Sequence, residues 1–361
     1  MSSLKKIKDR IQSVRATRQI TASMKVIAVS RLKKKHSAFL ETIPFADEMN
    51  RVVRRLVRSI KLRQENLNWN NENKVIKLPR LVDGNAEEKK FLVVVLSSDD
   101  GLSGTSLLQV IGHARKLIDY LIANGKEVRV FFYGSKGDSV LKKHYPDIPI
   151  TAIKRKNNVN PYLMAERLTA GVIEAFYSNK FDVCLTVYNQ FKSVVSQIPV
   201  VEQLIPDKLF LKDNPWHFLN DIQQTDYRQQ NALGQQQIKL KQSAFLSALG
   251  GADMLAPLKG SVFKTDLESG RRSPDVYDYE PSDIGLLESI LSQHLTAYIY
   301  RIMLESDVSD NASRLMAMDN ASRNAGDMLE ELNQIYRRNR QTKITTDIAE
   351  VSIGSSQENL S

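Results

Sequence analysis

The C-terminal stretch over 282–351 constrains this chain most, because it contains no proline and only two glycines, Gly285 and Gly326. Its composition would allow one helix of about 70 residues, which at ~1.5 Å per residue is a rod of roughly 100 Å. A helix of that length cannot bury itself within one globular domain, and such lengths are typical of coiled coils. We therefore expect it to pack along a second long helix.

The apolar spacing of this stretch is that of a coiled-coil seam. Five residues step by four, three, four and three positions: Ala321, Ala325, Met328, Leu332 and Ile335. Polar Asn339 and Thr342 occupy the next seam positions, and the stepping resumes on a shifted phase at Ile344, Ile348 and Val351. The apolar face is therefore expected to shift its position around the helix from one part of its length to the next.

The N-terminus supplies the second helix, since residues 1–43 contain neither glycine nor proline. A seam steps by three, four and three through Leu4, Ile7, Ile11 and Val14. Polar Arg18 and Thr21 interrupt it, and we expect it to continue on a new phase through Ile20, Met24, Ile27 and Leu32. Pro44 predicts a kink or a helical restart, with helical spacing continuing to Ile60. Two terminal helices with the same interrupted seam predict a paired coiled coil.

Between the two helices, short apolar runs alternate with helical patterns. Runs typical of buried strands cover 91–96, 128–133, 150–153 and 181–188. This alternation predicts a small α/β domain with a mainly parallel sheet, so the fold class is α/β plus a long α-helical coiled coil. The expected divisions are an N-terminal coiled-coil helix at 1–62, a linker at 63–90, the α/β domain at 91–206, an insertion or linker at 207–281, the C-terminal coiled-coil helix at 282–354 and a polar tail at 355–361.

Positive charge is concentrated in the first helix. The chain carries a net charge of +10, yet residues 1–63 hold seventeen Lys or Arg against four Asp or Glu, so the remainder is negative. Basic arms bind nucleic acid, anionic lipid or acidic protein surfaces. A basic coiled-coil adaptor that binds nucleic acid through residues 5–35 is therefore an alternative function, although no aromatic residue interleaves with the basic ones before Phe39. No apolar run is long enough to span a membrane.

An enzyme would have to use the loop over 99–104, which follows the first strand. Its small residues could cradle phosphate, and Asp99 could act as a nucleophile or metal ligand. The loop nevertheless lacks the Lys-Ser/Thr pair of a P-loop and is not a G-x-G-x-x-G fingerprint, and a tight turn explains it. Cys184 lies in an apolar run and is expected to be a buried, inert thiol. With five scattered histidines besides, we predict no catalytic residue, no cofactor and no metal site.

Several motifs resemble the gamma subunit of the F-type ATP synthase. The opening helix is similar at 7–14 (IKDRIQSV), 17–21 (TRQIT) and 24–28 (MKVIA), and the C-terminal signature at 314–325 (RLMAMDNASRNA) and 336–341 (YRRNRQ). Segments at 200–206 (VVEQLIP) and 279–282 (YEPS) are similar to those that flank the junction of domain and rod in that family. The resemblance covers about four fifths of the chain.

The resemblance implies an antiparallel coiled coil on a Rossmann-like domain, and a non-catalytic rotor shaft that couples proton-driven rotation of a c-ring to ATP synthesis or hydrolysis. The implied partners are three alpha and three beta subunits, the epsilon subunit and the c-ring, with no nucleic acid. Contact with the membrane would be peripheral, through the complex, at the cytoplasmic face of a bacterial inner membrane.

The resemblance also implies which residues contact the catalytic head. Arg340 and Gln341 match the pair that hydrogen-bonds a catch loop of the beta subunit, with Thr345 nearby. Met24 and Lys25 fall where the opening helix faces the acidic lever of the beta subunit. The alternatives are that Met24 only packs in the seam and that Arg340 is only a solvated charge.

Overall fold

The computed structural model describes residues 2–69, 78–85, 88–97, 101–134, 136–154, 159–206 and 283–358. The expected insertion at 207–281 lies outside them. The chain forms two compact units. The first, which we call the shaft unit, comprises Met1–Arg31 and Arg314–Ser361, and the second, the domain unit, comprises Leu32–Ser313.

Two long helices contribute to both units, as the absence of helix breakers over 1–43 and of proline over 282–351 predicted. Helix α1 spans Ser2–Trp69 and α8 spans Asp283–Glu358. Pro44 lies inside α1 and does not end it. A proline at this position removes the hydrogen bond to the carbonyl of Leu40, four residues earlier. Both residues are exposed, so water can satisfy that carbonyl and the helix continues.

The domain unit contains a five-stranded mixed sheet in the order β3-β2-β1-β4-β5. Its strands are β1 (Lys90–Leu96), β2 (Glu127–Tyr133), β3 (Ile150–Ile153), β4 (Val183–Phe191) and β5 (Gln197–Ile205). All neighbours are parallel except β4 and β5, which pair antiparallel. The prediction of a mainly parallel sheet is confirmed.

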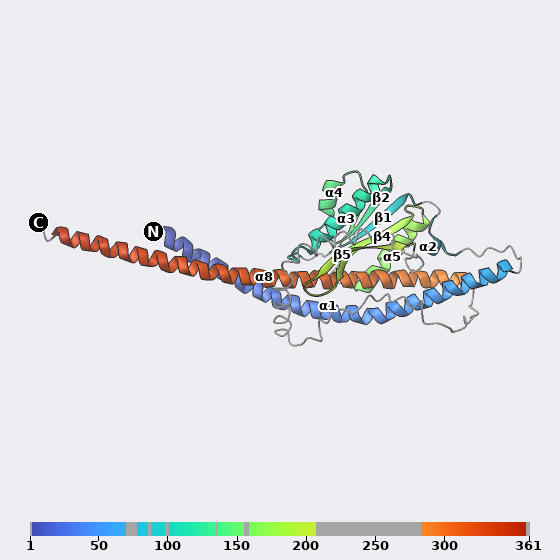
Figure 1. Ribbon diagram of the computed structural model, residues 1–361, viewed down its shortest axis with the longest axis horizontal. Helices are drawn as coiled ribbons and strands as arrows, with labels where there is room; N and C mark the ends of the chain where they lie inside the picture. Colours follow the sequence, from blue (N-terminus) through green and yellow to red (C-terminus); the bar gives the residue numbers. More distant parts are fainter. Residues whose placement is uncertain are drawn as a thin grey trace. The chain divides into compact units, whose positions relative to one another are not determined.

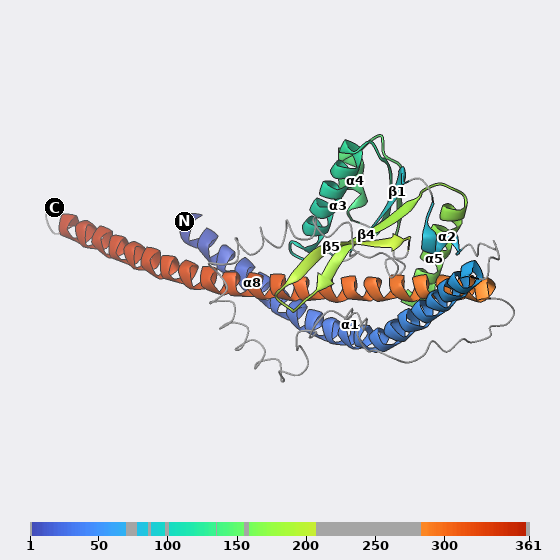
Figure 2. The same ribbon diagram turned by 45° about the vertical axis from the view of Figure 1, so that its right-hand side comes forward.

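Helices cover both faces of this sheet (Figure 1). On one face, α3 (Ser106–Ala123) packs on a cluster of strand residues, with α4 (Asp138–His144) beside β3. On the other face, α5 (Pro161–Tyr177) packs together with the parts of α1 and α8 that belong to this unit. Figure 2 shows α3 and α4 on one side of the strands and α8 and α1 on the other. The short α2 (Arg80–Asp83) contributes Leu81 and Val82 to this second core.

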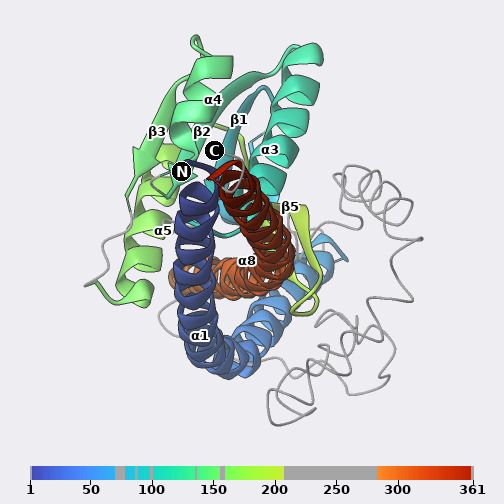
Figure 3. The same ribbon diagram turned by 90° about the vertical axis from the view of Figure 1, so that its left-hand side faces the viewer.

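The shaft unit is an antiparallel pair of helices, visible side by side in Figure 3. Lys25 contacts Asp319, and Arg18 lies against Gly326, so a step of seven residues along α1 matches seven in reverse along α8. The first predicted seam of α1 is half-buried at its four positions, Leu4, Ile7, Ile11 and Val14. The two long terminal helices therefore pack together as predicted.

The predicted phases of the seam were partly wrong. Ile20 and Ile27 were expected inside but are 59% and 53% exposed, whereas the polar Thr21 is buried. The Thr21 hydroxyl donates to the carbonyl of Arg18, which satisfies it within its own helix and allows it to continue the first seam. On α8, Leu329 is buried while Met328 is 42% exposed. The side of a helix that is buried depends on its partner as well as on its own apolar period.

Candidate functional site

The five predicted contact residues all lie in the shaft unit, in two separate groups. Arg340, Gln341 and Thr345 are on α8, and Met24 and Lys25 are on α1. Because Lys25 lies beside Asp319, the two groups are separated by about twenty residues of α8, or roughly 30 Å along the helix. The structure therefore does not bring them into one site.

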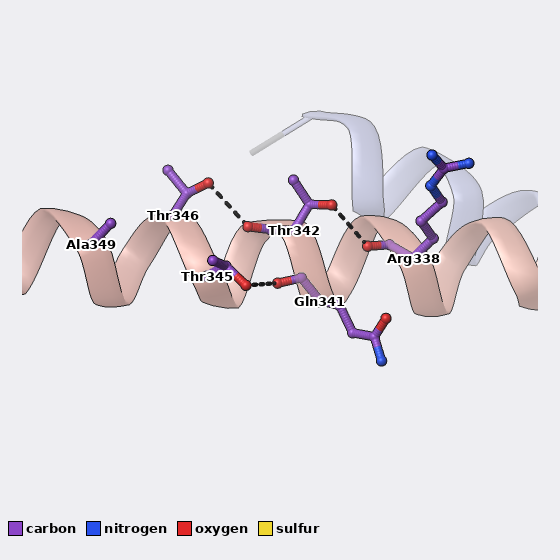
Figure 4. Close-up of a pocket in the computed structure, with 6 residues that line it drawn as sticks. All are labelled: Arg338, Gln341, Thr342, Thr345, Thr346 and Ala349. Atoms are coloured by element: carbon purple, nitrogen blue, oxygen red, sulfur yellow. Dashed lines mark hydrogen bonds between the residues drawn. The ribbon is translucent and has the colours of Figure 1, made fainter.

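The three residues on α8 are exposed. Thr345 donates its hydroxyl to the carbonyl of Gln341 at 3.0 Å, and Thr342 and Thr346 make the same bond at 3.1 and 3.0 Å to the carbonyls four residues before them. In Figure 4 the Gln341 side chain extends away from the helix, on a face shared with Thr345. Within the described part of the chain, the Arg340 guanidinium and the Gln341 amide bond to no other side chain. Both remain available to an outside partner.

The end of α8 also exposes apolar side chains. Ile344 is 45% exposed and Ile348 is 64% exposed, and α8 continues past the start of α1 in the shaft unit (Figure 1). A helix that exposes both apolar and hydrogen-bonding groups is typical of a segment that another protein encloses. The exposed end is thus a candidate interaction surface.

Lys25 is already engaged within the chain. Its Nζ atom lies 2.7 Å from Oδ1 of Asp319, and Nη2 of Arg323 lies 2.5 Å from Oδ2 of the same carboxylate. The Asp319 side chain is only 6% exposed, whereas that of Lys25 is 33% exposed. Met24 is half-buried, as its alternative role in seam packing requires. Sequence reasoning missed Asp319 as a partner, because it lies 294 residues from Lys25.

The loop after β1 faces side chains of α8. Residues 98–100, which include Asp99, lie outside the described residues. The carbonyl of Ser103 accepts a hydrogen bond from the Ser313 hydroxyl at 2.7 Å. At the first residue of α3, the Ser106 hydroxyl donates to Oδ1 of Asp310 at 2.5 Å. A carboxylate from the same chain thus lies at the helix N-terminus where a phosphate could have been expected.

A second polar cluster joins α8 to β4 and β5 in the domain unit. Oε2 of Glu202 accepts hydrogen bonds from the hydroxyls of Tyr188 and Tyr298. Arg301 lies 4.0 Å from Glu202 and 3.6 Å from Glu305. Burial raises the pKa of the Glu305 carboxyl to about 7, against the opposing effect of Arg301. The only sequence signal for this cluster was the spacing of four between Arg301 and Glu305 within an apolar stretch.

Three further features bear on function: the single cysteine, possible metal ligands and possible membrane-spanning helices. Cys184 is fully buried, and burial raises the pKa of its thiol, so the prediction of a buried thiol is confirmed. In the ranges that the structure describes, no three His, Cys, Asp or Glu side chains gather as metal ligands. The described helices include none that is both long and apolar enough to cross a bilayer.

Comparison with known proteins agrees with this architecture. Residues 3–356 match the family model described as ATP synthase. The ATP synthase gamma chain of Pelagibacter ubique (strain HTCC1062) is 30% identical over 357 residues, which are 98% of this chain and 99% of that protein.

Two solved structures share the fold. One is the central stalk and c-ring of the Tetrahymena thermophila mitochondrial ATP synthase, with a TM-score of 0.50 and 22% identity over 84% of this chain and 99% of that chain. The other is a Euglena gracilis mitochondrial ATP synthase structure containing OSCP, F1 and the c-ring, with a TM-score of 0.51 and 15% identity over 98% of this chain and 94% of that chain. The chain therefore belongs to the gamma-chain family of ATP synthase, a non-catalytic subunit of that complex.

Proposed function

We propose that this chain couples rotation of a proton-driven c-ring to ATP synthesis and hydrolysis in a head of three alpha and three beta subunits. The observation that carries the proposal is the course of α8. Its first part is buried in the core of the domain unit, and its last part is exposed at the end of the shaft unit. One continuous helix can therefore transmit a rotation from the domain to the head.

The proposed partners follow from the surfaces of the two units. The domain unit would contact the c-ring and the epsilon subunit, and the shaft unit would lie inside the head. In support, the two solved assemblies that share the fold contain a c-ring, and one of them also contains F1. Contact with the membrane would be peripheral, through the complex, at the cytoplasmic face of a bacterial inner membrane.

The exposed end of α8 supplies the contact with the catalytic head. Arg340 and Gln341 would hydrogen-bond a catch loop of the beta subunit, and Thr345 would present its methyl group because its hydroxyl is already bonded. Met24 and Lys25 would face the acidic lever of the beta subunit. Lys25 is one-third exposed, so it can keep Asp319 as a partner and still present positive charge to that lever.

The excess of basic residues at the start of α1 also fits a protein partner. Most of its lysines and arginines, among them Lys5 and Arg10, are exposed. We assign them to acidic surfaces of the head rather than to nucleic acid. A salt-dependent affinity of the assembled complex for DNA or RNA would contradict this assignment.

The direct test is purification from the native cell. A tag at the domain unit, membranes solubilised in mild detergent and an ATPase assay on the recovered material should yield alpha, beta and epsilon subunits, the c-ring and ATP hydrolysis. Reconstituted in vesicles, that complex should pump protons when ATP is added. Recovery of the chain alone, or with nucleic acid and without ATPase activity, would refute the proposal.

A further inference from the structure

The face of α8 that is buried in the domain unit changes character along the helix. Over 287–303 it is mainly apolar and shares a core with β1, α5 and α1. The buried polar residues between 301 and 313 include Arg301, Glu305, Ser309, Asp310 and Ser313. Four of them step by four residues, so they lie along one ridge of the helix. We call these five residues the polar ridge.

The first end of the polar ridge bonds the two antiparallel strands. Arg301 lies 4.0 Å from the carboxylate of Glu202 on β5. Oε1 of Glu305 accepts the backbone N–H of Phe191, the last residue of β4, at 3.3 Å. Arg301 also lies over the ring of Tyr298, 5.1 Å from its centroid. This end of the ridge is therefore held by charge as well as by hydrogen bonds.

The other end bonds residues that follow β1 and the C-terminal part of β4. Ser309 donates its hydroxyl to the carbonyl of Asn189 at 2.8 Å. Asp310 accepts from Ser106 at 2.5 Å, and Ser106 in turn accepts from Nδ2 of Asn189 at 2.7 Å. Ser313 donates to the carbonyl of Ser103 at 2.7 Å. Side chains from one helix thus reach three separate segments of the domain.

Bonds of this kind define a register, which apolar packing alone does not. Moving α8 by one residue shifts it by about 1.5 Å and turns it by about 100°. Side-chain contacts of about 3.6 Å or more are no longer hydrogen bonds, so such a move would break the contacts of the ridge together and leave buried polar groups without partners. Apolar side chains could repack after the same move. Buried polar residues specify register in helix pairs for this reason.

We propose that the polar ridge locks α8 in one rotational and axial register on the α/β domain, so that a turn of the domain produces an equal turn of α8. The ridge members are positioning residues, which act through the helix. This inference rests on the proposed function, because it specifies where torque passes between the domain and the shaft.

The test deletes two bonds between the helix and the domain, with a control that deletes one bond inside the helix. The variant Ser309→Ala/Ser313→Ala loses the hydroxyls that reach Asn189 and Ser103. The control, Thr296→Val, loses a buried hydroxyl of α8 that bonds only the carbonyl of Ser292 on the same helix, at 3.0 Å. Each chain is assembled into whole ATP synthase and reconstituted in vesicles.

Two measurements report register. Proton pumping is compared with ATP hydrolysis, and spin labels at Ile122→Cys on α3 and Ser289→Cys on α8 report the distance between helix and domain. Both positions are exposed, and buried Cys184 will not take the label. Each lost bond should favour a slipped register about fivefold. In the serine variant we expect the rate of proton pumping to fall at least about threefold more than the rate of ATP hydrolysis, and the distribution of label distances to broaden. The valine control should show neither change.

If the serine variant and the valine control show the same ratio of pumping to hydrolysis and the same label distances, the polar ridge does not fix the register of α8. If the serine variant fails to assemble, Asp310→Asn, which keeps the side-chain volume and weakens the bond to Ser106, is measured in its place with the same two outcomes. The proposed function would fail separately, because the wild-type complex would then show no pumping linked to hydrolysis.

Discussion

Nζ of Lys25 lies 2.7 Å from Oδ1 of Asp319, and this ion pair links the two helices of the shaft unit. The carboxylate is nearly buried and also faces Arg323 at 2.5 Å, so one negative charge serves two cations. The pair fixes which residues of α1 and α8 lie side by side. It gives Lys25 a role inside the chain in addition to the proposed contact with the head.

Breaking this pair should loosen the shaft unit. We expect Asp319→Asn to destabilise the pairing by about 1 kcal/mol, because Lys25 and Arg323 then face each other without a counter-charge. Amide hydrogen exchange over 18–28 of the full chain should speed up accordingly. Arg51→Met, which breaks an exposed pair with Glu48 within α1, is the control and should change nothing. Unchanged exchange in Asp319→Asn would show that apolar packing alone holds the two helices.

Replacing the exposed pair on α8 should affect catalysis and not folding. We expect Arg340→Ala/Gln341→Ala to lower coupled ATP synthesis by about tenfold, the scale of one lost interface hot spot. The melting temperature should stay the same because both side chains are exposed. Arg338→Ala removes a similar exposed charge that lies about 200° around the helix from Arg340, and is the control. If the Arg338 control slows synthesis as much as the double variant, net charge rather than a specific contact is responsible.

Stability of the domain unit should depend on pH through Glu305. Burial raises its folded-state pKa from 4.5 to about 7, so between these values the folded chain holds a proton that the unfolded chain has released. This contribution is full below pH 4.5 and is lost as pH rises through 7. Glu305→Gln should therefore be more stable than wild type at pH 8, by about 3 kcal/mol, and close to it at pH 4.5.

Urea unfolding at the two pH values checks this difference. The exposed Glu331→Gln, also on α8, is the control and should follow wild type at both. A Glu305→Gln chain that is less stable than wild type at pH 8 would mean that its charged pair with Arg301 outweighs the cost of burial.

Two glycine substitutions should have opposite effects on stability. Gly84 has φ +78°, and a Cβ there would lie 2.5 Å from Cγ of Pro206, so Gly84→Ala should cost about 2 kcal/mol. Gly112 lies inside α3, where a Cβ would meet no atom within 4 Å, so Gly112→Ala should gain about 1 kcal/mol. Thermal unfolding of both chains tests the pair. Equal melting temperatures would contradict the strain at Gly84.

Local patterns were sufficient for the elements of the fold. The absence of helix breakers predicted both long helices, and apolar runs predicted four of the five strands within three residues. The exception was β5, which was not predicted as a strand; one of its residues, Glu202, accepts a hydrogen bond from Tyr298 on α8. These properties depend on each residue and its near neighbours, so they can be predicted without knowledge of the rest of the chain.

By itself, then, the sequence determined the helices, most strands, the mainly parallel sheet and the family. Only the tertiary structure decided which side of each helix is buried and which distant residues meet. Thr21 is inside while Ile20 is exposed, Lys25 meets Asp319, and Asp310 meets Ser106. The physical reason is that an apolar period limits a helix to a few possible buried faces, whereas the choice among them depends on a partner hundreds of residues away.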